Sequence, residues 1–291
     1  MTPSAPIEVL GRRFRNPVLL AAGTAGFGRE LAGIVDLSRL GGLVTKAVSV
    51  NPRIGNPAPR VAEFAGGMLN SVGLANPGLA EVRQTSLPWL AAEWPDLPVI
   101  VNVVGDTEED YATVVAGLEN CPGVTALELN LSCPNSHAGG LEFGADAGSV
   151  AAVVSACRAR TRRPIVAKLS PALPDIPAMA AAAIDAGADG VSLVNTLPGY
   201  LFGANGATTR LGQGNGGVSG PALLPIGVLA VRKVRQRLPG AVIIGVGGIR
   251  SAEDARQYLR AGANLVAIGT AALADPRIPE TVAAELEPSD G

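Results

Sequence analysis

The feature that most constrains the fold is a set of eight short apolar segments spread along nearly the whole chain. Each is rich in Val, Ile, Leu or Ala and is followed by a segment with helical patterning. Strands that are buried on both faces of a parallel sheet have this continuous apolar character. The predicted strands are residues 17–23, 42–48, 98–104, 126–131, 164–169, 190–195, 241–246 and 265–268.

Strands that alternate with helices predict a parallel sheet whose outer face is covered by helices. Eight such units fit a (β/α)8 TIM barrel, which usually takes about 250 residues, with additional loops. A doubly wound sheet would need a G-x-G-x-x-G turn after its first strand, and residues 23–28 match that pattern poorly. We therefore expect an α/β protein in which residues 1–291 form a single barrel domain.

Three departures from a minimal barrel are expected. Residues 7–10 and 13–16 flank Gly11-Arg12 and predict an N-terminal hairpin that caps the bottom of the barrel. Long insertions, 51–76 and 196–220, follow strands two and six and leave the strand ends where barrel active sites are built.

The sequence also predicts helices between the strands, at 108–120, 148–160, 174–186, 221–238 and 252–261.

Composition narrows the classes of function. The formal net charge is −2 and the chain has no basic run, which argues against a nucleic-acid partner. The sequence shows no membrane-spanning stretch and no signal peptide, and three cysteines form no disulfide framework, so we expect a cytoplasmic protein without a membrane partner. Cys121 and Cys157 are expected to be structural. One histidine and no ligand cluster predict no catalytic metal.

Polar residues end five successive predicted strands. In a parallel barrel these carboxyl ends meet at one mouth, so two cations and three amides should line a pocket for a planar polar ligand with anionic parts. The five residues are Lys46, Asn102, Asn130, Lys168 and Asn195.

Glycine-rich turns follow the last two predicted strands, at residues 245–249 and 269–271, and a further glycine run lies at 214–220. Backbone amides at such turns bind anions, and barrels frequently hold a phosphate at this position. A phosphate-bearing planar cofactor beside a lysine suggests flavin mononucleotide (FMN). Lys168 would stabilise the negative charge that develops at N1/O2 of the reduced ring.

Cys133 follows the fourth predicted strand and lies between two amide side chains. Leucines at 127, 129 and 131 alternate with polar residues, which places Asn130 near the end of the strand. A thiol in this position suits a base or nucleophile beside a polar ligand. His137 is expected to be exposed or to gate the site, and Glu128 to pair with a polar neighbour inside the barrel.

Several motifs together resemble the dihydroorotate dehydrogenases, flavoenzymes of pyrimidine biosynthesis. The resemblance extends from about Pro17 to Asp275 and in combination is highly specific. The motifs are Thr45-Lys46, residues 55–60 (GNPAPR), residues 67–78 (GMLNSVGLANPG), residues 130–135 (NLSCPN), residues 168–171 (KLSP), Val194-Asn195-Thr196 and the glycine turns.

The resemblance implies a concrete reaction. Cys133, as a thiolate, would remove a proton from C5 of (S)-dihydroorotate while C6 delivers hydride to N5 of FMN, giving orotate in de novo pyrimidine biosynthesis. A cysteine base is similar to the soluble class, and the phrase at residues 53–60 resembles the NAD-linked subclass. Such catalytic subunits pair with a second subunit that carries FAD and an iron–sulfur cluster, which implies a homodimer or a heterotetramer.

The resemblance also implies the residues of the site. The implied catalytic residue is Cys133. The implied substrate-binding residues are Lys46, Asn70, Ser71, Val72, Gly73, Leu74, Asn130, Asn135, Asn195 and Thr196. The implied cofactor-binding residues are Ala22, Lys46, Ala47, Asn102, Asn130, Lys168, Val194, Gly220, Gly247, Gly248, Gly269 and Thr270.

Three alanines depart from the family pattern. Ala22 stands where a serine often precedes the glycine, Ala47 replaces a small polar residue after the lysine, and Ala172 replaces an asparagine. They bear on affinity or subclass and leave the core of the site intact.

Three other functions stay open from the sequence. A flavin-dependent reductase of the dihydropyrimidine (uracil/thymine) dehydrogenase type would share the barrel, the flavin and the cysteine. A tRNA dihydrouridine synthase would need a basic face and an added RNA-binding domain, and neither is evident in the sequence. A non-catalytic flavin-binding subunit would keep the phosphate glycines but would not need Cys133, Asn135 and Asn195 together.

Overall fold

The computed structural model describes residues 7–132, 143–204 and 206–286. Within them, a closed, all-parallel barrel contains eight strands, one for each predicted segment, and consecutive strands are neighbours with β14 closing onto β3. This confirms the predicted (β/α)8 TIM barrel. The strands are β3 (Val18–Leu20), β4 (Gly42–Val44), β7 (Val99–Val103), β8 (Val124–Asn130), β9 (Ile165–Leu169), β10 (Gly190–Leu193), β13 (Val242–Val246) and β14 (Leu265–Ile268).

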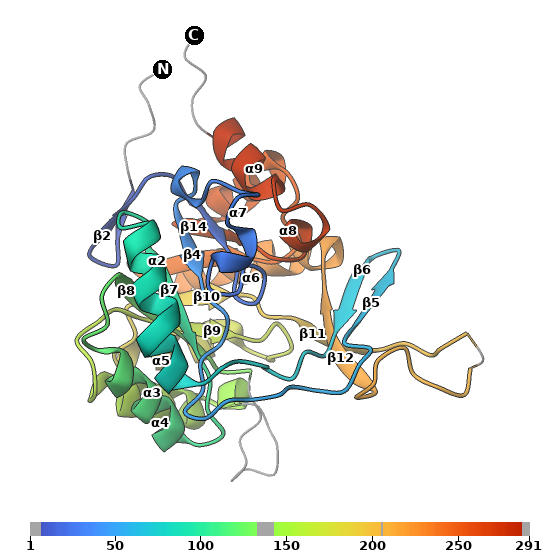
Figure 1. The fold of residues 1–291 in the computed structure, drawn as a ribbon, viewed down its shortest axis with the longest axis horizontal. Coiled ribbons are helices and arrows are strands. Elements are labelled where there is room, and N and C mark those ends of the chain that lie inside the picture. The colour runs from blue at the N-terminus through green and yellow to red at the C-terminus, as the bar shows by residue number, and fades with distance from the viewer. Residues whose placement is uncertain (1–6, 133–142, 205, 287–291) are drawn as a thin grey trace.

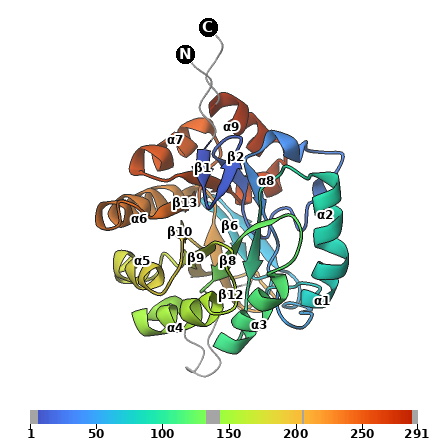
Figure 2. The same ribbon diagram turned by 90° about the vertical axis from the view of Figure 1, so that its left-hand side faces the viewer.

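Helices surround the strands in chain order (Figure 2). They are α1 (Leu79–Glu81), α2 (Leu87–Glu93), α3 (Glu108–Leu118), α4 (Ala147–Arg158), α5 (Ile176–Asp185), α6 (Leu224–Arg237), α7 (Ala252–Ala261), α8 (Thr270–Ala274) and α9 (Ile278–Leu286), with a π-helical turn, Val82–Ser86, between α1 and α2. The connection from β3 to β4 differs from the expectation of a helix after every strand. It contains two 3-10 turns, Arg29–Leu31 and Leu37–Arg39, in place of an α-helix.

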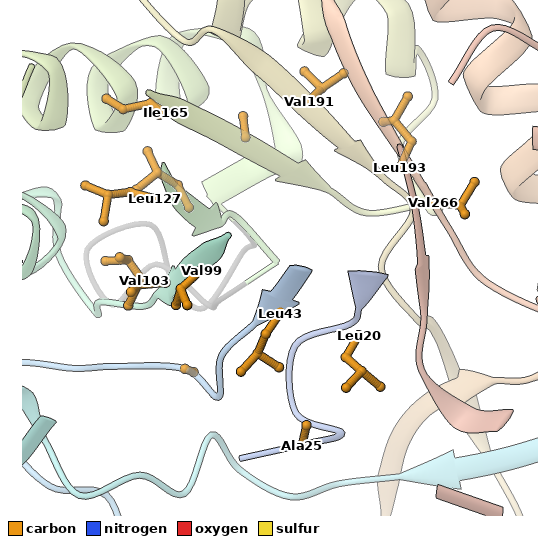
Figure 3. Close-up of a cluster of buried hydrophobic side chains, with 14 of the residues drawn as sticks. Leu20, Ala25, Leu43, Val99, Val103, Leu127, Ile165, Val191, Leu193 and Val266 are labelled. Carbon is orange, nitrogen blue, oxygen red and sulfur yellow. The ribbon is translucent and has the colours of Figure 1, made fainter. Parts of the chain in front are cut away.

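Side chains alternate between the two faces of the barrel wall. Outward-facing residues such as Leu127, Ile165 and Val191 pack against the helices in the larger apolar cluster (Figure 3). Inward-facing residues such as Ile100, Ala126 and Val166 form a second cluster inside the barrel. The period of two residues per strand therefore decides which polar side chains can reach the interior.

The N-terminal hairpin is confirmed as β1 (Ile7–Val9) paired antiparallel with β2 (Arg12–Phe14), and Figure 2 shows it over one end of the barrel. Leu10 and Gly11 have φ values of 52° and 65°, so the turn begins one residue earlier than Gly11-Arg12. Leu10 and Phe14 are buried in the same cluster as the inward-facing strand residues. The hairpin thus closes the interior of the barrel at its amino-terminal end.

The two insertions form a joint sheet, which the sequence did not predict. Among the described residues, β5 (Val61–Phe64), β6 (Gly67–Asn70), β11 (Leu197–Tyr200) and β12 (Asn215–Ser219) form an antiparallel sheet in the order β11-β12-β6-β5. Figure 1 shows this sheet beside the barrel. Ala62, Leu69 and Leu211 form its own small apolar cluster. The sheet fixes the two insertions to each other.

Arginine side chains fasten the loops at the amino-terminal end of the barrel. The guanidinium of Arg163, just before β9, donates hydrogen bonds to the carbonyl oxygens of Glu119 (2.7 Å), Cys121 (2.8 Å) and Val124. A planar fork of donors can satisfy several carbonyls that would otherwise lack partners. Arg163 therefore ties the end of α3 to the start of β8.

We expect Arg163→Lys to lower the free energy of unfolding by about 1–3 kcal/mol, because an ammonium cannot serve three carbonyls in this geometry. Arg162→Lys is the matched control. The Arg162 side chain is exposed, and the change should stay within about 0.5 kcal/mol. Urea unfolding of both variants measures the difference, and equal midpoints would contradict the role of Arg163.

Candidate active site

Five polar residues lie at the carboxyl ends of their strands as predicted. Asn130 is the last residue of β8, and Asn102 and Lys168 are the next-to-last residues of β7 and β9. Lys46 and Asn195 follow β4 and β10 by two residues. The closed parallel barrel therefore places all five at one mouth.

Three of these strands carry a buried polar network. Asn102 Nδ2 donates a hydrogen bond to Glu128 Oε1 (2.7 Å), and Lys168 Nζ lies 3.4 Å from the same oxygen. All three residues are at most 7% exposed. The expectation that Glu128 pairs with a polar neighbour inside the barrel is confirmed. This network forms the floor of the mouth.

A second set of hydrogen bonds joins β8 to the segment after β10. Asn195 Nδ2 donates to Asn130 Oδ1 (2.9 Å), and the backbone N–H of Thr196 donates to Asn195 Oδ1 (2.9 Å). The Tyr111 hydroxyl of α3 donates to the carbonyl oxygen of Asn130 (2.6 Å). The Leu193–Val194 peptide bond just before Asn195 is cis. Two amide side chains are thus held in fixed relative orientations beside the network of Glu128.

The insertions bring Asn70 to the same region. Asn70 ends β6, pairs in register with Gly217 of β12, and donates from Nδ2 to the Gly217 carbonyl oxygen (3.1 Å). A Cβ at Gly217 would lie 2.1 Å from Thr196 Oγ1, so β12 packs directly against Thr196. The joint sheet therefore carries Asn70 next to residues that follow β10.

Two asparagines hold the loop at residues 71–75. Asn56 Nδ2 donates to Ser71 Oγ (2.8 Å), and the Asn56 N–H donates to the Val72 carbonyl oxygen (3.1 Å). Asn76 Nδ2 donates to the Leu74 carbonyl oxygen (2.8 Å). Both lie in motifs quoted above, but their part in fixing the loop became visible only in the structure.

Tyr258 of α7 contacts the backbone of the glycine turn that follows β13. The Tyr258 hydroxyl lies 2.9 Å from the carbonyl oxygen of Val246 and 2.8 Å from that of Gly247. Burial raises the pKa of Tyr258, so its hydroxyl stays a donor. A Cβ at Gly227 would lie 1.9 Å from the Tyr258 hydroxyl oxygen, so glycine there leaves room for this side chain. No sequence motif pointed to Tyr258.

The turns after β13 and β14 have the features of a phosphate site. Gly247 and Gly248 have φ values of 118° and 78°, a conformation that favours glycine. In the described part of the chain, neither N–H group donates a hydrogen bond to another residue. Gly269, at the turn after β14, lies beside Ala21 and Thr24, whose nearest atoms would be 3.6 and 3.8 Å from a Cβ at this position. Backbone N–H groups without a partner in the described part of the chain suit an anion.

These groups fit the two ends of FMN. Lys168 uses one donor on Glu128 within the described part of the chain, and an ammonium has three, so two remain for the ring of a cofactor. The turns after β13 and β14 offer amides to its phosphate. Donors that have no partner among the described residues, at both ends, are the observations that favour this ligand.

Other predicted residues contribute through their backbone or lie elsewhere. The side chains of Ala47 and Val194 are buried in the outer apolar cluster, so only their backbones could face a ligand. Ala22 packs against the inner cluster. Gly220 has a φ of 104° and precedes the 3-10 turn Pro221–Leu223 that leads into α6.

Several predictions fall outside the described residues. They are Cys133, Asn135 and His137. The two other cysteines, Cys121 and Cys157, are buried free thiols, as expected for structural residues. Burial raises the pKa of Cys157 to about 12, which keeps it unreactive.

Neither a membrane-spanning helix nor a metal site is found among the described residues. No helix among them is both long enough and apolar enough to cross a bilayer. No group of three or more His, Cys, Asp or Glu residues there could hold a metal ion.

Comparison with known proteins gives a consistent result. A family model described as dihydroorotate dehydrogenase matches residues 4–289. A protein of Desulforudis audaxviator is 46% identical over 289 residues, covering 99% of this chain and 92% of that protein. One of Geobacillus kaustophilus is 45% identical over 280 residues, covering 96% and 88%. Both relatives are named dihydroorotate dehydrogenase B (NAD(+)), catalytic subunit.

We expect Tyr258→Phe to lower the free energy of unfolding by about 1–2 kcal/mol, because it removes the hydroxyl donor shared between the carbonyl oxygens of Val246 and Gly247. Tyr200→Phe is the matched control, since Tyr200 is 50% exposed on β11. Guanidinium unfolding of both variants measures the effect. An unchanged midpoint for Tyr258→Phe would show that the hydroxyl does not hold the turn.

Proposed function

Because the chain belongs to the dihydroorotate dehydrogenase family, we propose that it oxidises (S)-dihydroorotate to orotate in pyrimidine biosynthesis, with FMN as its cofactor. The observation that carries this proposal is the joint presence, at one barrel mouth, of a lysine with unused donors, a set of amides and a glycine-rich anion site. These three features match a flavin ring, a pyrimidine substrate and a phosphate, respectively.

FMN would be held along the mouth from β9 to β14. Lys168 would donate to the ring, and Asn102 and Asn130 would border it from the neighbouring strands. A bound flavin supplies the hydride acceptor for the reaction. The further residues proposed to contact the cofactor are Ala22, Lys46, Ala47, Val194, Gly220, Gly247, Gly248, Gly269 and Thr270.

The amides would hold the substrate. The hydrogen bond from Asn195 to Asn130 fixes how each amide presents its remaining donors and acceptors, which suits the amide edges of a dihydropyrimidine. Thr196 is adjacent to Asn195, the joint sheet brings Asn70 beside Thr196, and Lys46 would bind the substrate carboxylate. We also propose that Asn135 and residues 71–74 bind the substrate. Orientation of this kind lowers the barrier by presenting the reacting carbon to the base.

Cys133 would act as the base. As a thiolate it accepts the proton from C5, while the electron pair of the broken C6–H bond leaves as hydride and the C5–C6 double bond of orotate forms. In the sequence, Cys133 directly follows Ser132 and is the third residue after the last residue of β8, Asn130.

The electron acceptor is proposed from the relatives. Both are named as NAD(+)-linked catalytic subunits. We propose that this chain likewise passes electrons to NAD+ through a partner subunit with FAD and an iron–sulfur cluster, as a homodimer or within a heterotetramer. The described residues contain two free cysteines and no candidate metal group, so a cluster would belong to the partner.

The principal alternative, a reductase of uracil-type bases, would use the same barrel and flavin. It has no substrate carboxylate to bind, whereas the mouth here carries a second lysine, Lys46, besides Lys168. Family membership and the names of the relatives also favour dihydroorotate. Neither the family membership nor the names of the relatives supports a non-catalytic flavin subunit.

We expect the purified chain to bind FMN and to lose absorbance near 450 nm when it is mixed anaerobically with L-dihydroorotate. Cys133→Ala should keep the flavin and bleach at least about 100-fold more slowly, because the general base is missing. Cys157→Ala is the matched control and should bleach at the wild-type rate, since that thiol is buried in α4.

The outcomes separate the hypotheses. A yellow protein that stays yellow with dihydroorotate but bleaches with reduced uracil would favour the alternative reductase. A protein that takes up no flavin would contradict the whole proposal.

Activity should rise with pH. The thiolate is the proposed base, and a cysteine pKa is ordinarily about 8.5. The rate of flavin reduction should therefore increase from about pH 6 and level off once Cys133 is ionised. In Cys133→Ser the rate should be low and should keep rising at high pH, since a hydroxyl ionises far less readily. A flat wild-type profile would count against Cys133 as the base.

A further inference from the structure

One ion pair of the described residues has both side chains almost fully buried. The Lys168 and Glu128 side chains are 8% and 1% exposed, whereas every other ion pair found there has at least one partner that is more than 35% exposed. Burying two charges has a desolvation cost that their mutual attraction offsets only with good geometry. A pair of this kind needs a reason beyond stability.

The geometry of the pair is unequal. Glu128 Oε1 is held firmly by Asn102 Nδ2 at 2.7 Å, but Lys168 Nζ lies at 3.4 Å, longer than a usual charge-assisted hydrogen bond of about 2.8 Å. Asn102 therefore makes the shorter of the two contacts with the carboxylate, and Lys168 makes the longer one. Within the described part of the chain, the two remaining donors of Lys168 have no partner.

Among the described residues, the inward-facing side chains packed inside the barrel are apolar, among them Ile100, Ala126 and Val166. Ser192 is the register partner of Lys168 on β10 and is neutral. Charges in such surroundings act strongly on one another and on a bound ligand, because little water screens them.

We propose that Glu128 is a positioning residue that sets the reduction potential of the bound flavin through Lys168. The carboxylate offsets part of the charge that the Lys168 ammonium would present to a bound flavin. The ring gains negative charge on reduction, and Lys168 stabilises that charge less than an unpaired ammonium would. This inference rests on the proposed FMN cofactor.

The test is the midpoint potential of the flavin in Glu128→Gln. Glutamine is close in size, and its amide oxygen can still accept from Asn102, so the change removes charge and keeps shape. The expected result is a shift toward the reduced flavin of about tenfold in the equilibrium ratio, or about 30 mV more positive for two electrons. Lys168→Met should shift the potential in the opposite direction.

The control is Ser192→Ala. Ser192 is fully buried, and its hydroxyl has no hydrogen-bond partner in the described part of the chain. Its removal perturbs the packing beside Lys168 but changes no charge, so the potential should stay at the wild-type value. An equal shift in Ser192→Ala and Glu128→Gln would overturn the proposal, because it would show a general packing effect.

The double variant shows whether Glu128 acts through the lysine. In a Lys168→Met background, Glu128→Gln should change the potential much less than in the wild type. An undiminished shift would overturn the positioning role, and so would a wild-type potential in the single Glu128→Gln variant. If Glu128→Gln does not fold, Glu128→Asp withdraws the charge by one methylene and should give a smaller shift of the same sign.

Failure of the inference and failure of the proposed function give different results. A wild-type chain that binds FMN and oxidises dihydroorotate, with no shift in Glu128→Gln, contradicts only the role of Glu128. A wild-type chain that binds no flavin contradicts both.

Discussion

The register between neighbouring strands of the barrel is the constraint on which the candidate site depends. Asn102 lies opposite Glu128, Asn130 opposite Lys168, and Lys168 opposite Ser192. Because side chains alternate along a strand, a slip of one residue in any of these pairs would turn a polar group into the outer apolar cluster. The hydrogen bonds of Glu128 in turn favour this register, so the fold and the site specify each other.

The second requirement is the contact between the two insertions. Asn70 and Gly217 are 147 positions apart, yet the pairing of β6 with β12 brings Asn70 beside Thr196. The sequence did not predict this sheet, because its strands are not continuous apolar runs like those of the barrel. β12 is also glycine-rich and lacks clear alternation. Such pairing depends on tertiary contacts, which local sequence patterns do not reveal.

The barrel itself was predictable because each of its strands is a continuous apolar run, and polar residues such as Lys168 and Asn195 stood out against that background. Tyr111 and Tyr258 carried no such signal. The hydroxyl of Tyr111 donates to the carbonyl oxygen of Asn130, and that of Tyr258 to the carbonyl oxygen of Val246. In a sequence, a tyrosine within a helical pattern indicates only that this face of the helix is buried. Supporting residues of this kind become visible only when the helix and the strand are placed together.

The placement of polar groups on the barrel strands has a physical consequence for how the site works. The groups that the strands carry are held by many contacts on both faces of the barrel wall, so charges such as Glu128 and Lys168 keep a fixed distance from anything bound above them. Preorganised charge is effective because it needs no rearrangement when the ligand changes its own charge. In the proposed function, substrate contacts come largely from residues outside the barrel strands, such as Asn70 and Thr196. Under that proposal, a rigid floor at the strand ends would govern the electrons and segments outside the barrel would select the substrate, and one chain can meet both demands.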